Sequence, residues 1–427
     1  MQFSTIATLS ALFFTAAAGV QAAPSAHAAS HHNVAARSPG SLHHKLSARD
    51  ASSPLAQAAH NVAKKRAKRT QKKCRLRPTS SLSATAAPTS TSGSSSGSVS
   101  GTVSSTSNVT STNAGSSAQP SSTPSTQTFN TPWSLEVKNQ GRTFFDGWTF
   151  WNAPDPTHGT VNYVDAGTAW NTGLISVTDT QAIMRVSTEQ YQHMRQSVRI
   201  HGKHVFNINS LLVMDAEHMP TGCGTWPAWW ANGPNWPAGG EIDILEGVHD
   251  SDTNSATLHT SYGCTAVSDA NHPSSGQLIN ANCGSSGSSN TGCGFADVTS
   301  QNTYGAGFNS AKGGVYAMQW VDSGISVWFF PRGAIPADLA ADQPMPWTWQ
   351  HPFAHWSASG CSPRDFFRDQ IAIFDTTFCG DWAGATWGSS GCAQKTGFES
   401  CERYVRENGS AFSEAYWTVN YVKYFKQ

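Results

Sequence analysis

Three acidic side chains occur within six consecutive residues, in the segment 241–246 with the sequence EIDILE. In a β-strand, side chains alternate between the two faces, so Glu241 and Asp243 are expected to point the same way. Glu246 lies five positions after Glu241, and an unbroken strand would send it to the opposite face. One extra residue in the strand, a β-bulge, restores the common face. We therefore predict a bulge between Asp243 and Glu246 and a row of three carboxyl groups.

Most glycosidases use a pair of neighbouring carboxyl groups as their catalytic residues. In retaining enzymes the two groups are ~5–5.5 Å apart. Crowding separates the pKa values, so one Glu stays ionised as a nucleophile while the other stays protonated as an acid. The alternatives are a calcium site and a solvated acidic edge strand. Three like charges on one face cost stability unless something compensates for them, which favours catalysis.

Tryptophan is concentrated near these acids, at Trp226, Trp229, Trp230 and Trp236, with Trp382 as a further candidate. Sugar rings have flat apolar faces that stack on aromatic rings. For any single tryptophan the alternative is packing in the core, and this is the favoured interpretation for Trp226 and Trp230. The group as a whole indicates a carbohydrate substrate.

The elements that must position these residues are short strands separated by Gly, Pro, Asn and Asp turns. Many short strands of this kind predict a β-sandwich or jelly roll. Helical periodicity is scarce, and residues 398–407 are its best example. Examples of such strand candidates are residues 183–186, 198–200, 211–214, 315–320, 325–330, 371–374 and 416–424.

The chain before residue 129 differs in composition from the rest. Residues 1–22 resemble a secretory signal peptide, and their apolar run is too short for a stable membrane span. Residues 23–77 form a basic segment, either a pro-region with dibasic processing sites or a solvated basic tail. Residues 78–128 are a Ser/Thr-rich linker. Residues 129–427 carry 15 Lys and Arg against 26 Asp and Glu, so a nucleic-acid partner is not expected.

Eight of the nine cysteines lie after residue 222, and an even number in a secreted chain predicts disulfides. Eight cysteines allow 105 pairings, so the sequence leaves the connectivity open. A zinc site is the alternative, but neither C-x-x-C nor H-x-x-x-H spacing supports it. We expect no cofactor and no catalytic metal, and nothing in the sequence supports a structural calcium ion.

From about Trp148 to the C-terminus, the chain resembles glycoside hydrolase family 16, and within it the fungal laminarinases or endo-1,3(4)-β-glucanases. The acidic segment has the bulged form of that family's motif, E-x-D-x-x-E. Further matching segments are residues 155–159, 161–165, 197–200, 218–220, 223–227, 258–260, 327–332 and 378–384.

The resemblance implies an all-β jelly-roll sandwich of two curved antiparallel sheets, with glucan bound in a concave cleft. It implies Glu241 as nucleophile, Glu246 as general acid/base and Asp243 as the group that positions Glu241. His259 would lie on a neighbouring strand near Glu246. The residues that would line sugar subsites are Trp229, Trp236, Trp382, Arg199 and Asn162.

The function implied by the resemblance is that of a secreted or wall-associated retaining endo-β-1,3(4)-glucanase, acting as a monomer on β-glucan. Two alternatives remain open. A cell-wall transglycosylase uses the same chemistry but more often has the unbulged motif. A non-catalytic glucan-binding protein would usually lack the glutamate pair.

Overall fold

The structure is a computed structural model that describes residues 129–427, apart from residues 287, 288 and 301. The predictions for residues 1–22, 23–77 and 78–128 lie outside the described residues. No helix in the described part of the chain is long and apolar enough to cross a membrane.

One antiparallel sheet has the strand order β16-β15-β14-β8-β18-β5-β4, and β1 also pairs with β18. Strand β18 is long enough to pair β5 near its beginning and β1 near its end, along the edge opposite β8. The strands are β1 (Ser134–Gln140), β4 (Ile175–Val177), β5 (Ala182–Arg185), β8 (Ser210–His218), β14 (Gly314–Val321), β15 (Gly324–Pro331), β16 (Ala354–Ser357) and β18 (Tyr416–Lys426).

The other antiparallel sheet has the order β12-β13-β11-β10-β9-β17-β7-β2, so the acidic strand β10 lies near its middle. Two further strands, β3 (Val161–Tyr163) and β6 (Arg195–Ser197), form a short parallel pair. The strands of the large sheet are β2 (Trp148–Phe150), β7 (Arg199–Phe206), β9 (Thr225–Asn232), β10 (Glu241–Glu246), β11 (Ser255–His259), β12 (Gln277–Leu278), β13 (Cys293–Ala296) and β17 (Gln370–Phe378).

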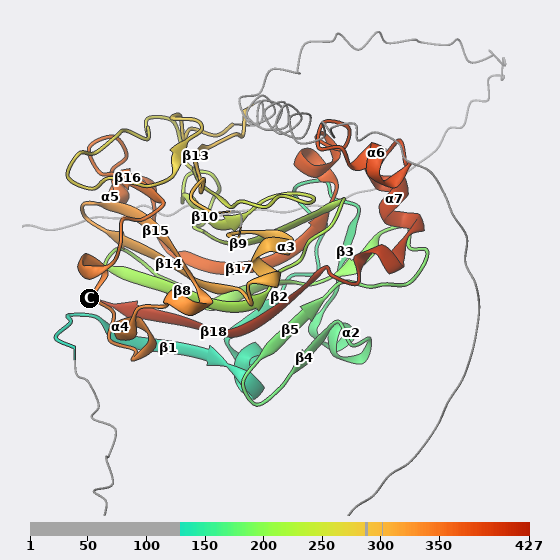
Figure 1. Ribbon diagram of the computed structural model, residues 1–427, viewed down its shortest axis with the longest axis horizontal. Coiled ribbons are helices and arrows are strands. Elements are labelled where there is room, and N and C mark those ends of the chain that lie inside the picture. The colour runs from blue at the N-terminus through green and yellow to red at the C-terminus, as the bar shows by residue number, and fades with distance from the viewer. Residues whose placement is uncertain (1–128, 287–288, 301) are drawn as a thin grey trace, which may run out of the picture. The chain divides into compact units, whose positions relative to one another are not determined.

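The helices are short and lie in the connections between strands (Figure 1). The expected helix at residues 398–407 begins slightly later, because Ser400 caps it by accepting a hydrogen bond from the backbone of Arg403. The α-helices are α2 (Ala166–Asn171), α3 (Gly305–Ser310), α4 (Ala337–Ala340), α5 (Pro363–Phe366), α6 (Cys392–Thr396) and α7 (Cys401–Glu407). Short helices of other types are η1 (Gly141–Gly147), η2 (Arg332–Ala334), η3 (Pro346–Thr348), η4 (Gly380–Gly384) and η5 (Gly409–Phe412).

The largest of three buried hydrophobic clusters lies between the two sheets. Trp229 and Phe374 enter it from the sheet that carries β10, and Trp320 and Trp417 enter it from the other sheet. The rings of Phe374 and Trp417 meet edge to face, with 5.3 Å between their centroids. The opposite face of the sheet that contains β8 and β14 is covered by a second buried cluster, which includes Leu211, Val213 and Leu339. The predicted all-β sandwich of two antiparallel sheets is confirmed.

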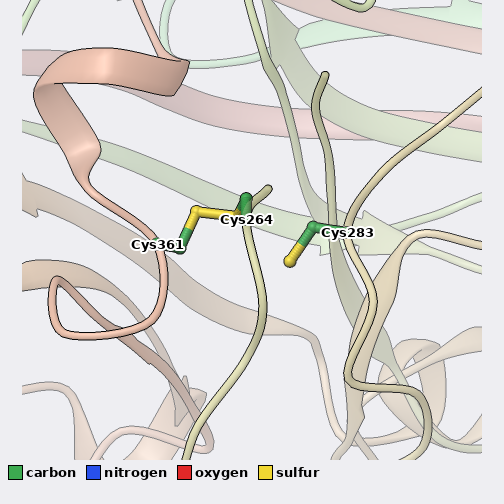
Figure 2. Close-up of side chains that lie close together, drawn as sticks. All are labelled: Cys264, Cys283 and Cys361. Atoms are coloured by element: carbon green, nitrogen blue, oxygen red, sulfur yellow. A yellow bond between two sulfur atoms is a disulfide. The ribbon is translucent and has the colours of Figure 1, made fainter. Parts of the chain in front are cut away.

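Four disulfides join the eight cysteines of this region. Figure 2 shows Cys361 bonded to Cys264, with Cys283 beside them. Two of the bonds tie distant segments together, since Cys223–Cys392 spans 169 residues and Cys264–Cys361 spans 97. The remaining pairs, Cys283–Cys293 and Cys379–Cys401, close shorter loops. The prediction of disulfides is confirmed for these eight cysteines, and the structure supplies the pairing.

Candidate active site

Strand β10 contains the predicted bulge. Asp243 lies opposite Trp230 of β9, whereas Leu245 lies opposite Trp229, so the pairing slips by one residue at Ile244. The side chains of Ile244 and Leu245 are both fully buried in the core. Glu241 and Glu246, at the two ends of the strand, are both half-buried. The bulge therefore places both glutamates on the face of the sheet that points away from the core.

Asp243 lies between the two glutamates and is almost fully buried. Strand β11 pairs His259 with Glu241 in register, and the His259 ring approaches Asp243, with 3.3 Å between Nε2 and Oδ2. On its other side, Nδ1 of His259 lies 3.0 Å from Oγ of Ser285 and 2.8 Å from Oδ1 of Asn290. His259 is thus on the neighbouring strand, as expected, and its direct contact is with Asp243.

Glu246 is held by contacts to both its side chain and its backbone. The indole Nε1 of Trp226 donates a hydrogen bond of 2.8 Å to Oε1 of Glu246. The backbone nitrogen of Glu246 donates to Oδ1 of Asn254, and the Asn254 amide donates to the carbonyl of Ile244. Asn254 therefore bridges the bulge itself and fixes the direction in which Glu246 leaves the strand.

Burial raises the pKa of Glu246 well above its usual range, and the charge of Asp243 adds to this effect. The hydrogen bond from Trp226 acts in the opposite direction because it stabilises the carboxylate. Burial also raises the pKa of Asp243 well above its usual range, and Glu241 contributes through its charge and a hydrogen bond. A protonated Asp243 can donate a hydrogen bond to an ionised Glu241.

Ligand atoms of Glu241, Asp243 and His259 all lie within 4.8 Å of one another, a spacing that a metal ion could bridge. Asp243 and Glu241 also share a hydrogen bond, so their carboxyl groups are placed as a pair that can share a proton. The arrangement is better suited to handling protons than to holding a metal.

Arg199 lies on the same face of the sheet but is held by protein groups. Its guanidinium forms an ion pair of 3.6 Å with Asp375 and lies between the rings of Trp151 and Trp230, about 5 Å from each centroid. Its Nε lies 3.0 Å from Nε2 of His201. Burial is the main reason that the pKa of Asp375 is raised to about 7. Arg199 therefore supports the position of Trp230, which is paired with Asp243.

The other predicted subsite residues differ in their exposure and in their contacts with the acids. Trp236 is 41% exposed, and its indole nitrogen donates a short hydrogen bond to Oε2 of Glu241. Trp382, in η4, is half-buried and meets the Trp226 ring edge to face. Asn162, on β3, is exposed and lines a cavity of about 610 Å³ with Asn152 and neighbouring residues.

The prediction for Trp229 is wrong. Its side chain is fully buried between the sheets, with its ring stacked on Phe374. Adjacent residues of a strand point to opposite faces, so Trp226 and Trp230 lie on the same side as the acids instead. The interpretation of these two tryptophans as core residues is therefore also wrong. The spacing shows that Trp226 and Trp230 share a face, but only the register with β10 shows which face it is.

Comparison with known proteins identifies the family of this chain. The XgeA-like catalytic domain of glycoside hydrolase family 16 (GH16) matches residues 148–425. An endo-1,3(4)-beta-glucanase of Arthroderma benhamiae is 40% identical over 300 residues, which cover 69% of this chain and 65% of that protein. A probable glycosidase of Schizosaccharomyces pombe is 40% identical over 67% of this chain and 68% of its own length.

Two solved structures share the fold. Laminarinase 16A from Phanerochaete chrysosporium, with β-glucans in its donor and acceptor sites, is 38% identical with a TM-score of 0.64. An elongating family 16 β-1,3-glucosyltransferase is 36% identical with a TM-score of 0.63. Each similarity covers 69% of this chain and at least 99% of the other. The chain spans about two-fifths to two-thirds of the length of several curated relatives. The match over residues 148–425 shows that this chain belongs to glycoside hydrolase family 16.

Proposed function

We propose that this protein is a retaining endo-β-1,3(4)-glucanase that cleaves internal bonds of β-1,3-containing glucans. The observation that carries the proposal is the bulge at Ile244, which brings Glu241 and Glu246 to one face of the sheet. The names of the relatives, an endo-1,3(4)-beta-glucanase and a laminarinase, support the substrate class.

In this proposal the surroundings of each acid fit its role. Glu246, with its raised pKa, donates a proton to the glycosidic oxygen while the carboxylate of Glu241 attacks the anomeric carbon. The bond to the leaving sugar breaks and a glycosyl ester forms on Glu241. Glu246 then removes a proton from water, which attacks the anomeric carbon and releases Glu241.

Three further groups support the glutamates. A protonated Asp243 donates to Glu241 and disperses its negative charge, and His259 keeps Asp243 in place. Trp236 binds the same carboxylate through its indole N–H, and its exposed ring offers a surface on which a sugar can stack. Trp382, beside Trp226, offers a second such surface.

The substrate class is tested by measuring reducing ends released from laminarin, lichenan, cellulose and xyloglucan side by side. We expect laminarin to be cleaved with retention, so that proton NMR detects the β-anomer first.

Glu241→Ala and Glu246→Ala should each lower kcat by orders of magnitude while the protein stays folded. Glu399→Ala, at an exposed acid between α6 and α7, is the control and should keep full activity. Near-normal turnover of laminarin by Glu241→Ala would overturn the assignment.

Azide distinguishes the two roles. In Glu241→Ala, azide can replace the missing nucleophile and give an α-glycosyl azide by a single inversion. In Glu246→Ala, assayed on a substrate with a good leaving group, azide can attack the glycosyl ester and give the β-glycosyl azide. The opposite pattern of anomers would exchange the two assignments.

Transfer to a sugar acceptor is the second candidate, because the glucosyltransferase neighbour has the same fold at 36% identity. Mass spectrometry of products from laminarin oligosaccharides decides between them. Products longer than the substrate indicate transfer, and only shorter products indicate hydrolysis.

An extracellular or wall-associated location is also part of this proposal. Four disulfides support it, because such bonds persist mainly in oxidising compartments. Peptide mapping of secreted protein would show where the mature chain begins.

A further inference from the structure

A second group of chemically capable side chains lies away from the acidic face of β10. Asp269 and His272 come from the long connection between β11 and β12, and His355 comes from β16 in the other sheet. One ligand atom from each of the three residues can be chosen so that all lie within 4.8 Å of one another. Nδ1 of His272 lies 3.0 Å from Oδ2 of Asp269, and Nε2 of His355 lies 4.0 Å from the same oxygen.

His355 points an unpartnered nitrogen into this cluster. Its side chain is 4% exposed, and among the described residues Nε2 has no hydrogen-bond partner. The other ring nitrogen, Nδ1, lies 2.8 Å from Oγ of Ser326, which fixes the orientation of the ring. A buried polar atom without a partner lowers the stability of the fold, and a bound ligand at this nitrogen would remove that cost.

The distances suit a shared ion better than a direct contact between His355 and Asp269. At 4.0 Å, the two atoms are too far apart for a hydrogen bond. Two ligands of one tetrahedral ion with bonds of ~2.0–2.1 Å lie roughly 3.3 Å apart. The 3.0 Å separation is a hydrogen bond between His272 and Asp269 that an ion would replace, and the 4.0 Å separation would have to shorten by less than 1 Å.

We propose that Asp269, His272 and His355 form a site for a divalent transition-metal ion, with Zn²⁺ as the preferred occupant and water as the fourth ligand. Two imidazoles and one carboxylate are typical zinc ligands, whereas calcium and magnesium prefer oxygen ligands alone. Ser326 supplies the outer contact that orients a metal-binding histidine.

The surrounding structure holds the three ligands in place. The backbone nitrogen of Asn271 donates to Oδ1 of Asp269, and Oγ of Ser357 donates to Oδ2, so the carboxylate is already oriented. Cys264, five residues before Asp269, is bonded to Cys361, six residues after His355 (Figure 2). The disulfide and the ion would together fasten the β11–β12 connection to β16.

The test compares the full chain with two single variants after chelator treatment and dialysis. His272→Ala removes an exposed ligand, so the protein is expected to fold normally. His351→Ala is the matched control, because His351 is also exposed but lies outside the cluster. A matched pair is necessary because residues 27–60 contain six further histidines that could bind zinc independently.

Zinc binding is measured by calorimetry, and thermal unfolding is followed with and without Zn²⁺. We expect Zn²⁺ to raise the unfolding temperature of the wild type and of His351→Ala. In His272→Ala, the zinc-dependent shift should vanish and one equivalent of bound zinc should be lost, because losing a ligand costs more affinity than the ~10–100-fold that follows loss of an outer-shell partner. Asp269→Asn should behave in the same way, and Ca²⁺ should shift none of the proteins. Equal zinc shifts in wild type and His272→Ala, or no zinc shift in the wild type, would overturn the proposal.

Discussion

The hydrogen bond from Trp226 to Glu246 couples an aromatic side chain to the proposed acid/base. The indole N–H stabilises the carboxylate form of Glu246, whereas burial and the charge of Asp243 favour the protonated form. In a glycosidase, the alkaline limb of the activity profile reports loss of the acid's proton. The hydrogen bond from Trp226 therefore lowers the pH at which the alkaline limb begins.

Trp226→Phe should shift the alkaline limb of kcat/KM to higher pH. Without the N–H donor, the carboxylate loses a stabilising contact and the pKa of Glu246 rises further. The measurement is a pH–rate profile on laminarin. Trp230→Phe is the matched control, because Nε1 of Trp230 has no hydrogen-bond partner among the described residues. An unchanged limb in Trp226→Phe, or the same shift in both variants, would contradict this account.

Asp375 should make stability depend on pH. Its pKa is raised to about 7 in the folded protein, mainly by burial, so its neutral form is favoured there. The stability that this group contributes is fully present below its unfolded pKa of ~3.9 and is lost as the pH rises towards 7.

Relative to Asp375→Asn, the wild type should therefore lose on the order of a few kcal/mol of unfolding free energy between about pH 4 and 7. The difference should become constant from about pH 8, where Asp375 is fully ionised in the folded protein as well. Denaturant unfolding of both proteins across this range measures it. A difference that stays flat from pH 4 to 7, or that grows in favour of the wild type, would show that burial does not dominate at Asp375.

Among the elements, β10 shows what the sequence could and could not predict. The bulge follows from the spacing of three acids and the two-residue period of a strand, so it was predictable and is confirmed. Strands such as β14 and β15 were also predictable from their apolar residues. Asn254, which bridges the bulge, comes from a turn before β11 and carries no local signal of its role.

Strand β9 shows the limit of the same reasoning. Its tryptophans mark it as important, but strand periodicity gives two faces without saying which one meets the core. That choice depends on the register between β9 and β10 across the connection from Asn232 to Glu241. A single sequence does not contain this register, and the predicted faces of Trp229 and Trp230 are therefore the reverse of those in the structure.

The disulfides should differ in their effect on stability according to the loops that they close. Replacing Cys264 and Cys361 by serine frees a loop of 97 residues, whereas replacing Cys283 and Cys293 frees a loop of 10. By chain entropy, loss of the longer cross-link should cost about 2 kcal/mol more. Guanidinium unfolding of both double variants tests this. Equal losses would mean that native packing around the bonds outweighs the entropy of the unfolded chain.

For the whole molecule, charge separates the two parts of the chain. Residues 1–128 contain 12 Lys and Arg and one acid, whereas residues 129–427 have 15 Lys and Arg against 26 acids. All the residues of the proposed active site, and all four disulfides, belong to the second part. Catalysis and binding to charged polymers should therefore be separable.

A chain that begins at residue 129 should cleave soluble laminarin with a kcat/KM within about twofold of the full chain, because laminarin is uncharged. The full chain should bind an anionic polysaccharide such as polygalacturonate at low salt and release it at high salt, because screening weakens contacts between exposed charges. The acidic shorter chain should not bind at either salt concentration. Sedimentation with the polymer at 20 and 500 mM NaCl, in parallel with laminarin kinetics, measures both properties. A loss of activity greater than tenfold in the shorter chain would show that residues before 129 contribute to the site.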